Sequence, residues 1–258
     1  MQRHTTNPQR LNALAKSLAV LEAVTDQPQA IGLPDLAARL NLPRQTLHRV
    51  LVQLEKLKLI VRDPARERYS VGPRLSKLAF ATLLSNNRGA PMRLVMQDLV
   101  ADIRETCNLG VLDGLDYVYV ERIECEWPLR IHVEVGDRVP AHSVSGGKLL
   151  LAYMDADQRR HLLKGRKLHK RTAKTRTKPA DLEADFAKIL SNGYATNNQE
   201  NFDGIVAAAV PVTDAQGRVV ASLTVHGPLP RLTLKACEAH VPRLLQAADR
   251  IGRVWNLP

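Results

Sequence analysis

Residues 36–57 read LAARLNLPRQTLHRVLVQLEKL, and this stretch decides the fold of the first third of the chain. Apolar residues recur at helical spacing on both sides of Asn41-Leu42-Pro43, which predicts two short amphipathic helices joined by a tight turn. The later helix begins with polar and basic residues. This order is typical of a helix-turn-helix, whose second helix enters the major groove of DNA.

The polar side chains at the start of the later helix have chemistry that suits DNA. Arg and Gln can form paired hydrogen bonds with base edges, while Thr and His suit phosphates or thymine methyls. A helix N-terminus also attracts phosphate. The predicted DNA-binding residues of this helix are Arg44, Gln45, Thr46, His48 and Arg49. A plain helical hairpin with a solvated polar face is the alternative.

Two short β-prone runs follow this helix directly, at residues 59–62 and 69–72, with the basic sequence DPARER between them. They predict a two-stranded wing. Together with a first helix at residues 12–25, the wing completes a winged helix-turn-helix domain over residues 11–73. Arg62, Arg66 and Arg68 are then expected to meet the phosphate backbone or the minor groove.

Charge and composition narrow the class of protein. The chain has 258 residues, room for two modest domains, and its net charge of +11 favours a polyanionic partner. Residues 1–80 hold 13 Lys and Arg against 6 Asp and Glu. Three scattered cysteines predict a cytoplasmic protein without disulfides. No apolar run reaches membrane-spanning length, and residues 1–10 are expected to be a disordered basic tail.

The rest of the chain predicts a second domain of α+β class. A helical stripe from Pro73 that breaks at NNRGAP, residues 86–91, indicates a connector helix and hinge over residues 74–90. Beyond it, over residues 91–258, strands are flanked by helices at both ends. The strands are expected at 109–112, 117–123, 129–135, 206–212 and 219–226. The helices are expected at 94 to about 108, 146–154, 155–164, 180–191 and within 232–255.

Four segments together carry a resemblance to a known family: SLAVLE at 17–22, LAARLNLP at 36–43, TLHRVL at 46–51 and YSVGPRL at 69–75. With them the chain resembles the IclR family of bacterial transcription regulators, over nearly its whole length. The resemblance implies a GAF-like effector-binding domain after the winged helix-turn-helix. It also implies binding to double-stranded operator DNA as a homodimer, with dimers pairing into tetramers.

The segment HSVSGGK, residues 142–148, is the best local candidate for a ligand site. Two glycines at a helix start expose backbone N–H groups that suit a carboxylate, although a sterically required turn is an equal alternative. In sensors of this family the pocket is lined by this loop, the segment 194–205 and the last hairpin. The effector-binding residues that the resemblance implies are Ser145, Gly146, Asn197, Ala207, Thr224 and His226.

Three of these positions depart from the family pattern. Asn197 stands where a carboxylate is common, Ala207 where Cys or Ser is frequent, and His226 where Ser is frequent. A lost negative charge and an added imidazole favour an anion, and Ala207 adds room. We therefore expect the effector to be a small organic acid, aliphatic or aromatic. A structural role for His226 is the alternative.

Two other classes of function stay open at this point. The basic charge would suit a non-specific nucleoid protein. An enzyme with an accessory DNA-binding domain would need a nucleophile–base pattern or a cofactor fingerprint, and we find neither. Ser145 and Lys148 match only a bare Ser-x-x-Lys. Histidine spacing indicates no metal site, and no cofactor is expected. The basic loop 161–179 is either a second nucleic-acid contact or a solvated, mobile loop.

The predicted reading face can be tested by substitution. Arg44→Ala or Gln45→Ala is expected to relax sequence preference, because these side chains would contact bases. Arg66→Ala is expected to weaken binding to all DNA about equally and to lower its salt dependence, because it would contact phosphates. Anisotropy titrations on operator and arbitrary duplexes measure both effects. Equal losses on every sequence for the helix variants would contradict the assignment.

Overall fold

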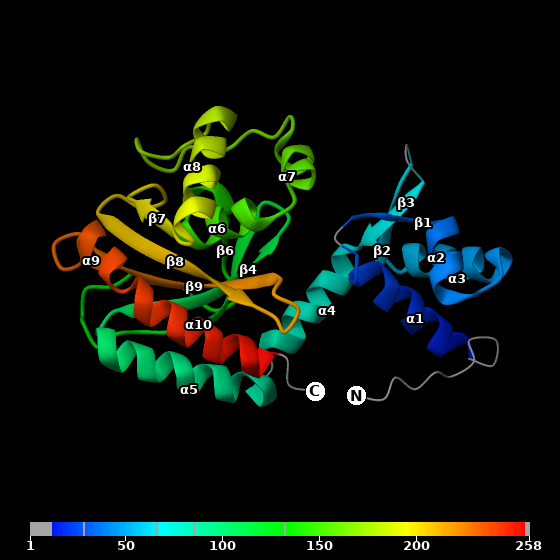
Figure 1. Ribbon diagram of the computed structural model, residues 1–258, viewed down its shortest axis with the longest axis horizontal. Helices are drawn as coiled ribbons and strands as arrows, with labels where there is room; N and C mark the ends of the chain where they lie inside the picture. The colour runs from blue at the N-terminus through cyan, green and yellow to red at the C-terminus, as the bar shows by residue number, and fades with distance from the viewer. Residues whose placement is uncertain (1–11, 28, 65–66, 85, 132, 256–258) are drawn as a thin grey trace. The chain divides into compact units, whose positions relative to one another are not determined.

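The computed structural model describes residues 12–27, 29–64, 67–84, 86–131 and 133–255 (Figure 1). The chain forms two compact units that divide between Thr82 and Leu83. We describe each unit by itself. Residues 1–10, the predicted tail, and Arg66 of the predicted wing lie outside the described residues.

The first unit is a small helical domain with a three-stranded antiparallel sheet of order β1-β3-β2. Its core gathers side chains from every helix and strand, with Leu36, Leu47 and Leu51 fully buried. The winged helix-turn-helix is thereby confirmed. Its elements are α1 (Ala13–Thr25), β1 (Ile31–Gly32), α2 (Leu33–Leu40), α3 (Arg44–Lys56), β2 (Ile60–Asp63) and β3 (Arg68–Val71).

The turn between α2 and α3 follows from two residues. Asn41 ends α2 at φ 49°, in the left-handed region that Asn tolerates better than most residues. Pro43 then precedes α3 and fixes an extended backbone there. No side chain caps the start of α3 within the described residues, so its first N–H groups face outward unpaired by a cap.

The second unit is built on one antiparallel sheet of six strands, in the order β6-β5-β4-β9-β8-β7. Two hairpins, β4–β5 and β8–β9, form its centre, and β4 pairs with β9 to join them. The strands are β4 (Thr106–Asp113), β5 (Asp116–Ile123), β6 (Arg138–Pro140), β7 (Ala195–Asn198), β8 (Ile205–Thr213) and β9 (Val219–Pro228).

Helices cover both faces of this sheet (Figure 1). The pair α5 and α10 packs along one face, and α6 with α8 covers the other. This α+β arrangement confirms the predicted class. None of the helices in the described ranges has the length and hydropathy needed to span a bilayer. The helices are α5 (Asn86–Ile103), α6 (Ser145–Tyr153), α7 (Ala156–Leu163), α8 (Pro179–Asn192), α9 (Leu234–Ala239) and α10 (Val241–Trp255), and α4 (Pro73–Leu84) joins the units.

The predicted strand at residues 129–135 is wrong. Leu129 and Val135 are exposed, and none of the segment's described residues, 129–131 and 133–135, belongs to a strand. Its carbonyl groups are satisfied differently: Arg231 donates to Leu129 O and Arg122 donates to Ile131 O. The strand that pairs with β5 is instead the short β6.

Several helix ends also differ from prediction. The expected break at 86–91 lies inside α5, where Pro91 is tolerated near the helix start. That helix ends at Ile103, so Cys107 belongs to β4. The final helix is divided at His240, because Pro242 suits only the first turn of the second piece. Neither β1 nor β7 was predicted; both are short.

Adjacent residues of α3 give a matched test of the first unit's core. Leu51 is fully buried, whereas Val52 is 48% exposed. Leu51→Ala is expected to lower the free energy of unfolding by about 2–5 kcal/mol, and Val52→Ala by less than about 0.5 kcal/mol. Circular dichroism in urea measures the loss. Both tryptophans, Trp127 and Trp255, lie in the second unit. The urea transition followed by their fluorescence should therefore be the same in both variants and in the wild type. Equal losses would contradict this packing.

Candidate functional site

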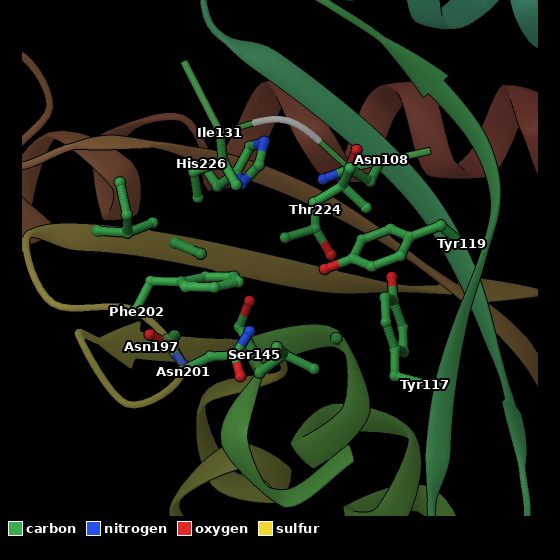
Figure 2. A pocket seen from close by; sticks show the side chains of 15 residues that line it. Asn108, Tyr117, Tyr119, Ile131, Ser145, Asn197, Asn201, Phe202, Thr224 and His226 are labelled. Atoms are coloured by element: carbon green, nitrogen blue, oxygen red, sulfur yellow. The ribbon is translucent and has the colours of Figure 1, made fainter. Parts of the chain in front are cut away.

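A cavity lies between the sheet and the N-terminus of α6 in the second unit (Figure 2). Its volume is about 450 Å³, counting the space at its mouth. All six residues that the resemblance implied line it. The nine lining residues that were not assigned are Asn108, Tyr117, Tyr119, Ile131, Val133, Val144, Asn201, Phe202 and Ile205.

Strand register brings the predicted residues together. Asn197 on β7 pairs with Ala207 on β8, which pairs with His226 on β9. Thr224 lies two residues before His226, so both side chains point to the same face, and it pairs with Asn108 on β4. One signal for the unassigned residues was present: Tyr117 and Tyr119 alternate on one strand and therefore share a face.

The two glycines at the start of α6 are required for close packing. A Cβ at Gly146 would lie 2.6 Å from Ser222 Oγ and 2.7 Å from the Tyr117 ring. A Cβ at Gly147 would collide with the Ala141 carbonyl. The steric alternative is therefore correct for both residues. The backbone N–H groups at the start of α6 are still available to a ligand, because Val144, the residue before the helix, makes no side-chain cap.

Two hydroxyl groups of the cavity wall lack well-formed hydrogen bonds. Within the described residues, Ser145 Oγ and Thr224 Oγ1 are buried and have no partner of good geometry. Burial raises the pKa of Tyr117, and the nearby hydroxyls of Ser222 and Thr224 oppose that rise. Buried polar groups are nearly always paired, so the hydroxyls of Ser145 and Thr224 await an acceptor or a donor.

The amide of Asn197 is largely occupied by the protein itself. Its Nδ2 donates to Ser143 O at 2.5 Å, and its Oδ1 accepts the N–H of Glu200 at 3.1 Å. Asn197 lines the cavity but chiefly ties the loop before α6 to the turn after β7. What remains for a ligand is one N–H and one lone pair of Oδ1, and only the N–H can bind a carboxylate.

His226 is a neutral imidazole. Burial, with the positive charges of Arg122 and Arg231, lowers the pKa of His226 to about 3. The ring stays uncharged at neutral pH, so it can favour an anion as a hydrogen-bond donor but not through a positive charge of its own. The cation next to this ring is Arg122, whose Nη1 lies 3.2 Å from His226 Nε2.

Lys148 has a structural role. Its Nζ donates to both carboxylate oxygens of Glu200 at 2.7 Å and to Asp185 at 3.1 Å. In the described structure no hydrogen bond joins Lys148 to Ser145, which is the contact that Ser-x-x-Lys chemistry would need. The described residues also contain no cluster of three potential metal-ligating side chains.

The predicted DNA-reading side chains project from α3 on one exposed face. Arg44, Gln45, His48 and Arg49 are exposed and Thr46 is half-buried. Among the described residues, none of these side chains has an ion pair or hydrogen bond, so all remain available to a partner. Their role stays a prediction.

The wing arginines are held by the first unit. Arg62 pairs with Glu67 across the wing at 2.7 Å. Arg68 donates to Ala30 O at 2.8 Å and lies 3.9 Å from Asp35. Both guanidinium groups are partly exposed, so a phosphate contact at these positions stays a prediction too.

The basic loop between α7 and α8 carries exposed Lys and Arg side chains and is tied to the turn after β7 by two threonines. Buried Thr172 and Thr175 bond to the carbonyl groups of Gln199 and Glu200. Arg171 lies over the Phe202 ring and bonds to Asn201, and these two residues line the cavity. The loop therefore supports one wall of the site.

The neutral state of His226 has a measurable consequence. Below pH 6.5 the unfolded chain protonates this residue, whereas the folded chain does so only near pH 3. Stability is therefore lost as pH falls, and this residue alone should cost about 1.4 kcal/mol at pH 5.5. Urea unfolding at pH 7.5 and 5.5 should give a smaller difference for His226→Gln than for the wild type. Equal differences would contradict the assignment.

Comparison with known proteins agrees with this architecture. The family described as "Bacterial transcriptional regulator IclR C-terminal" matches residues 82–253, and "IclR helix-turn-helix domain" matches residues 13–64. The probable transcriptional regulator SauR of Cupriavidus necator is 36% identical over 243 residues, which cover 94% of this chain and 96% of SauR.

Solved structures agree as well. The Thermotoga maritima IclR structure is 27% identical, with a TM-score of 0.62, and the match covers 94% of this chain and 98% of that one. An IclR homolog from Microbacterium hydrocarbonoxydans, complexed with 4-hydroxybenzoate, is 26% identical, with a TM-score of 0.59 and the same coverage. On both family matches and a relative aligned along almost its whole length, the chain belongs to the IclR family of bacterial transcriptional regulators.

Proposed function

We propose that this regulator binds a small organic acid in the cavity of its second unit and thereby controls a catabolic operon. The observation that carries the proposal is the pair of buried, poorly satisfied hydroxyls, Ser145 Oγ and Thr224 Oγ1, on the cavity wall. A buried polar group without a partner costs roughly 1–3 kcal/mol, which a ligand oxygen would recover.

The remaining lining favours an acid over a base. None of the described lining residues is acidic. Hydrogen-bond donors are available at the N-terminus of α6, which also carries a partial positive charge. Tyr117, Tyr119 and Phe202 provide an apolar body for the site, which suits aromatic as well as aliphatic acids. The homolog bound to 4-hydroxybenzoate supports an aromatic acid as a first probe.

On the DNA side, we propose that α3 and the wing contact operator DNA. The exposed, unpaired side chains of α3 support this role. We further propose a cytoplasmic homodimer whose dimers pair into tetramers, as the family resemblance implies. An effector can change DNA affinity only if it favours one arrangement of the chain over another. We propose that the connector α4 carries such a difference, because the chain passes from one unit to the other at its end.

Calorimetry with aliphatic and aromatic carboxylates tests the effector class. Thr224→Val removes one cavity hydroxyl without changing side-chain size and should weaken binding about 5- to 10-fold, the value of roughly one hydrogen bond. Thr213→Val is the matched control, because Thr213 lies exposed on β8 away from the cavity. Failure of every acid to bind, or equal losses in both variants, would contradict the proposal.

The regulatory coupling is measured with the acid that binds. Anisotropy titrations of DNA from upstream of the gene should give different affinities with and without it, and footprinting should show two half-sites about one or two helical turns apart. If the acid binds but DNA affinity does not change, the chain binds the ligand and the proposed control of DNA binding is wrong. Uniform coating of the DNA would indicate a non-specific binder.

A further inference from the structure

Arg122 is a buried cation directly behind the cavity wall. It lies on β5, only 4% of its side chain is exposed, and it is not itself a lining residue. A buried guanidinium is costly unless its N–H groups are satisfied. The hydrogen-bond partners of Arg122 therefore indicate what a buried cation does at this position.

Two of its contacts reach side chains that line the cavity. Arg122 Nη1 donates to Asn108 Oδ1 at 2.8 Å and lies 3.2 Å from His226 Nε2. Its other two contacts are to a backbone carbonyl and to a carboxylate: Nη2 donates to the carbonyl oxygen of Ile131, a third lining residue, at 2.6 Å, and Nε donates to Glu124 Oε1 at 3.2 Å.

The direction of these hydrogen bonds determines which groups of His226 and Asn108 are left to face the cavity. A guanidinium has no acceptor, so His226 Nε2 must accept and the ring proton must sit on Nδ1. Asn108 likewise uses its carbonyl oxygen toward Arg122, which leaves its NH₂ group to donate elsewhere. Figure 2 shows His226 and Asn108 near one another at the cavity wall, above Thr224.

We propose that Arg122 is a positioning residue that makes this wall of the cavity a donor-only surface for a carboxylate. It does so by fixing His226 as the Nδ1–H tautomer and Asn108 with its amide nitrogen toward the cavity, and its own charge lies behind both. The inference rests on the proposed function, since it names the part of the site that receives the acid group.

The charge balance around Arg122 agrees with this role. Its carboxylate partner, Glu124, is 36% exposed, is shared with Arg130, and does not line the cavity. Two further cations lie nearby: Arg231 is paired with Glu105 at 2.6 Å, and Arg171 lies over the Phe202 ring and donates to Asn201. The positive charge is therefore buried next to the cavity, while the compensating charge of Glu124 is on the solvent side, where water screens it.

The inference also orients the ligand. The carboxylate faces His226 and Asn108, which leaves the N-terminus of α6, on the opposite wall, to a polar group at the far end of the acid. The body of the acid lies against Phe202 and Tyr119, whose rings lie between these walls in Figure 2. An uncharged amide of the same shape presents an NH₂ group to a wall that already consists of donors. It should therefore bind much more weakly than the acid.

The tautomer is tested directly by nitrogen NMR of the full-length protein labelled with ¹⁵N-histidine, at pH 7 without ligand. In the wild type, His226 should show a bare Nε2 and a protonated Nδ1. Arg122→Met should give a mixture of tautomers, since Nε2 loses its donor. Arg130→Met is the matched control, because Arg130 shares Glu124 but touches neither His226 nor Asn108. An unchanged His226 signal in Arg122→Met would overturn the inference.

Ligand preference gives the second measurement. Calorimetry with 4-hydroxybenzoate and 4-hydroxybenzamide should show at least a tenfold preference for the acid in the wild type and in Arg130→Met. Arg122→Met should lose that preference. Arg122→Lys keeps the charge and serves as a second variant in case Arg122→Met misfolds. It should retain part of the preference for the acid but show a mixture of His226 tautomers. Equal binding of acid and amide by the wild type would overturn the inference.

The two proposals fail in different ways. If neither probe binds the wild type, the proposed aromatic acid is wrong, and the nitrogen signals still decide for or against the role of Arg122. If the acid binds while Arg122→Met keeps both tautomer and preference, the proposed function stands and the positioning role is lost.

Discussion

The pairing of β4 with β9 is the constraint on which the site depends. It joins the two hairpins of the sheet, and its register sets Asn108 opposite Thr224 and Thr106 opposite His226. These residues are more than a hundred positions apart in the chain. Side chains alternate between the faces of a strand, so a shift of one residue would turn Thr224 and His226 away from the cavity. A binding site built this way is as well defined as the sheet itself.

Buried ion pairs hold the wall of the cavity that α6 forms, opposite His226 and Asn108. Lys148 on α6 lies between Glu200, after β7, and Asp185 on α8. A buried ion pair contributes little net stability but fixes geometry, because losing one partner leaves an uncompensated charge. The neighbouring bonds of Asn197 act on the same segments. The N-terminus of α6 and the turn carrying Asn201 and Phe202 are thus set in place before any ligand arrives.

Local pattern predicted much of the fold. The period of the apolar residues identified the helices of the first unit and the hairpin β8–β9. The edge strand β7 was missed because ATNN has no such period, and the segment 129–135 was misassigned because its alternation is not used in a ladder. Six cavity residues followed from the family resemblance. Arg122 did not, because its importance depends on Asn108 and His226, which only the folded sheet brings to it.

The segment that follows β5 differs in kind from the other walls of the cavity. Ile131 and Val133 line the cavity, yet the carbonyl groups of Leu129 and Ile131 are held by the side chains of Arg231 and Arg122. These hydrogen bonds come from side chains and belong to no β-ladder. The other described lining residues belong to the sheet, to the start of α6 or to the turn fixed by Glu200. The positions of Ile131 and Val133 in the cavity wall are consequently set by two arginine side chains rather than by backbone pairing.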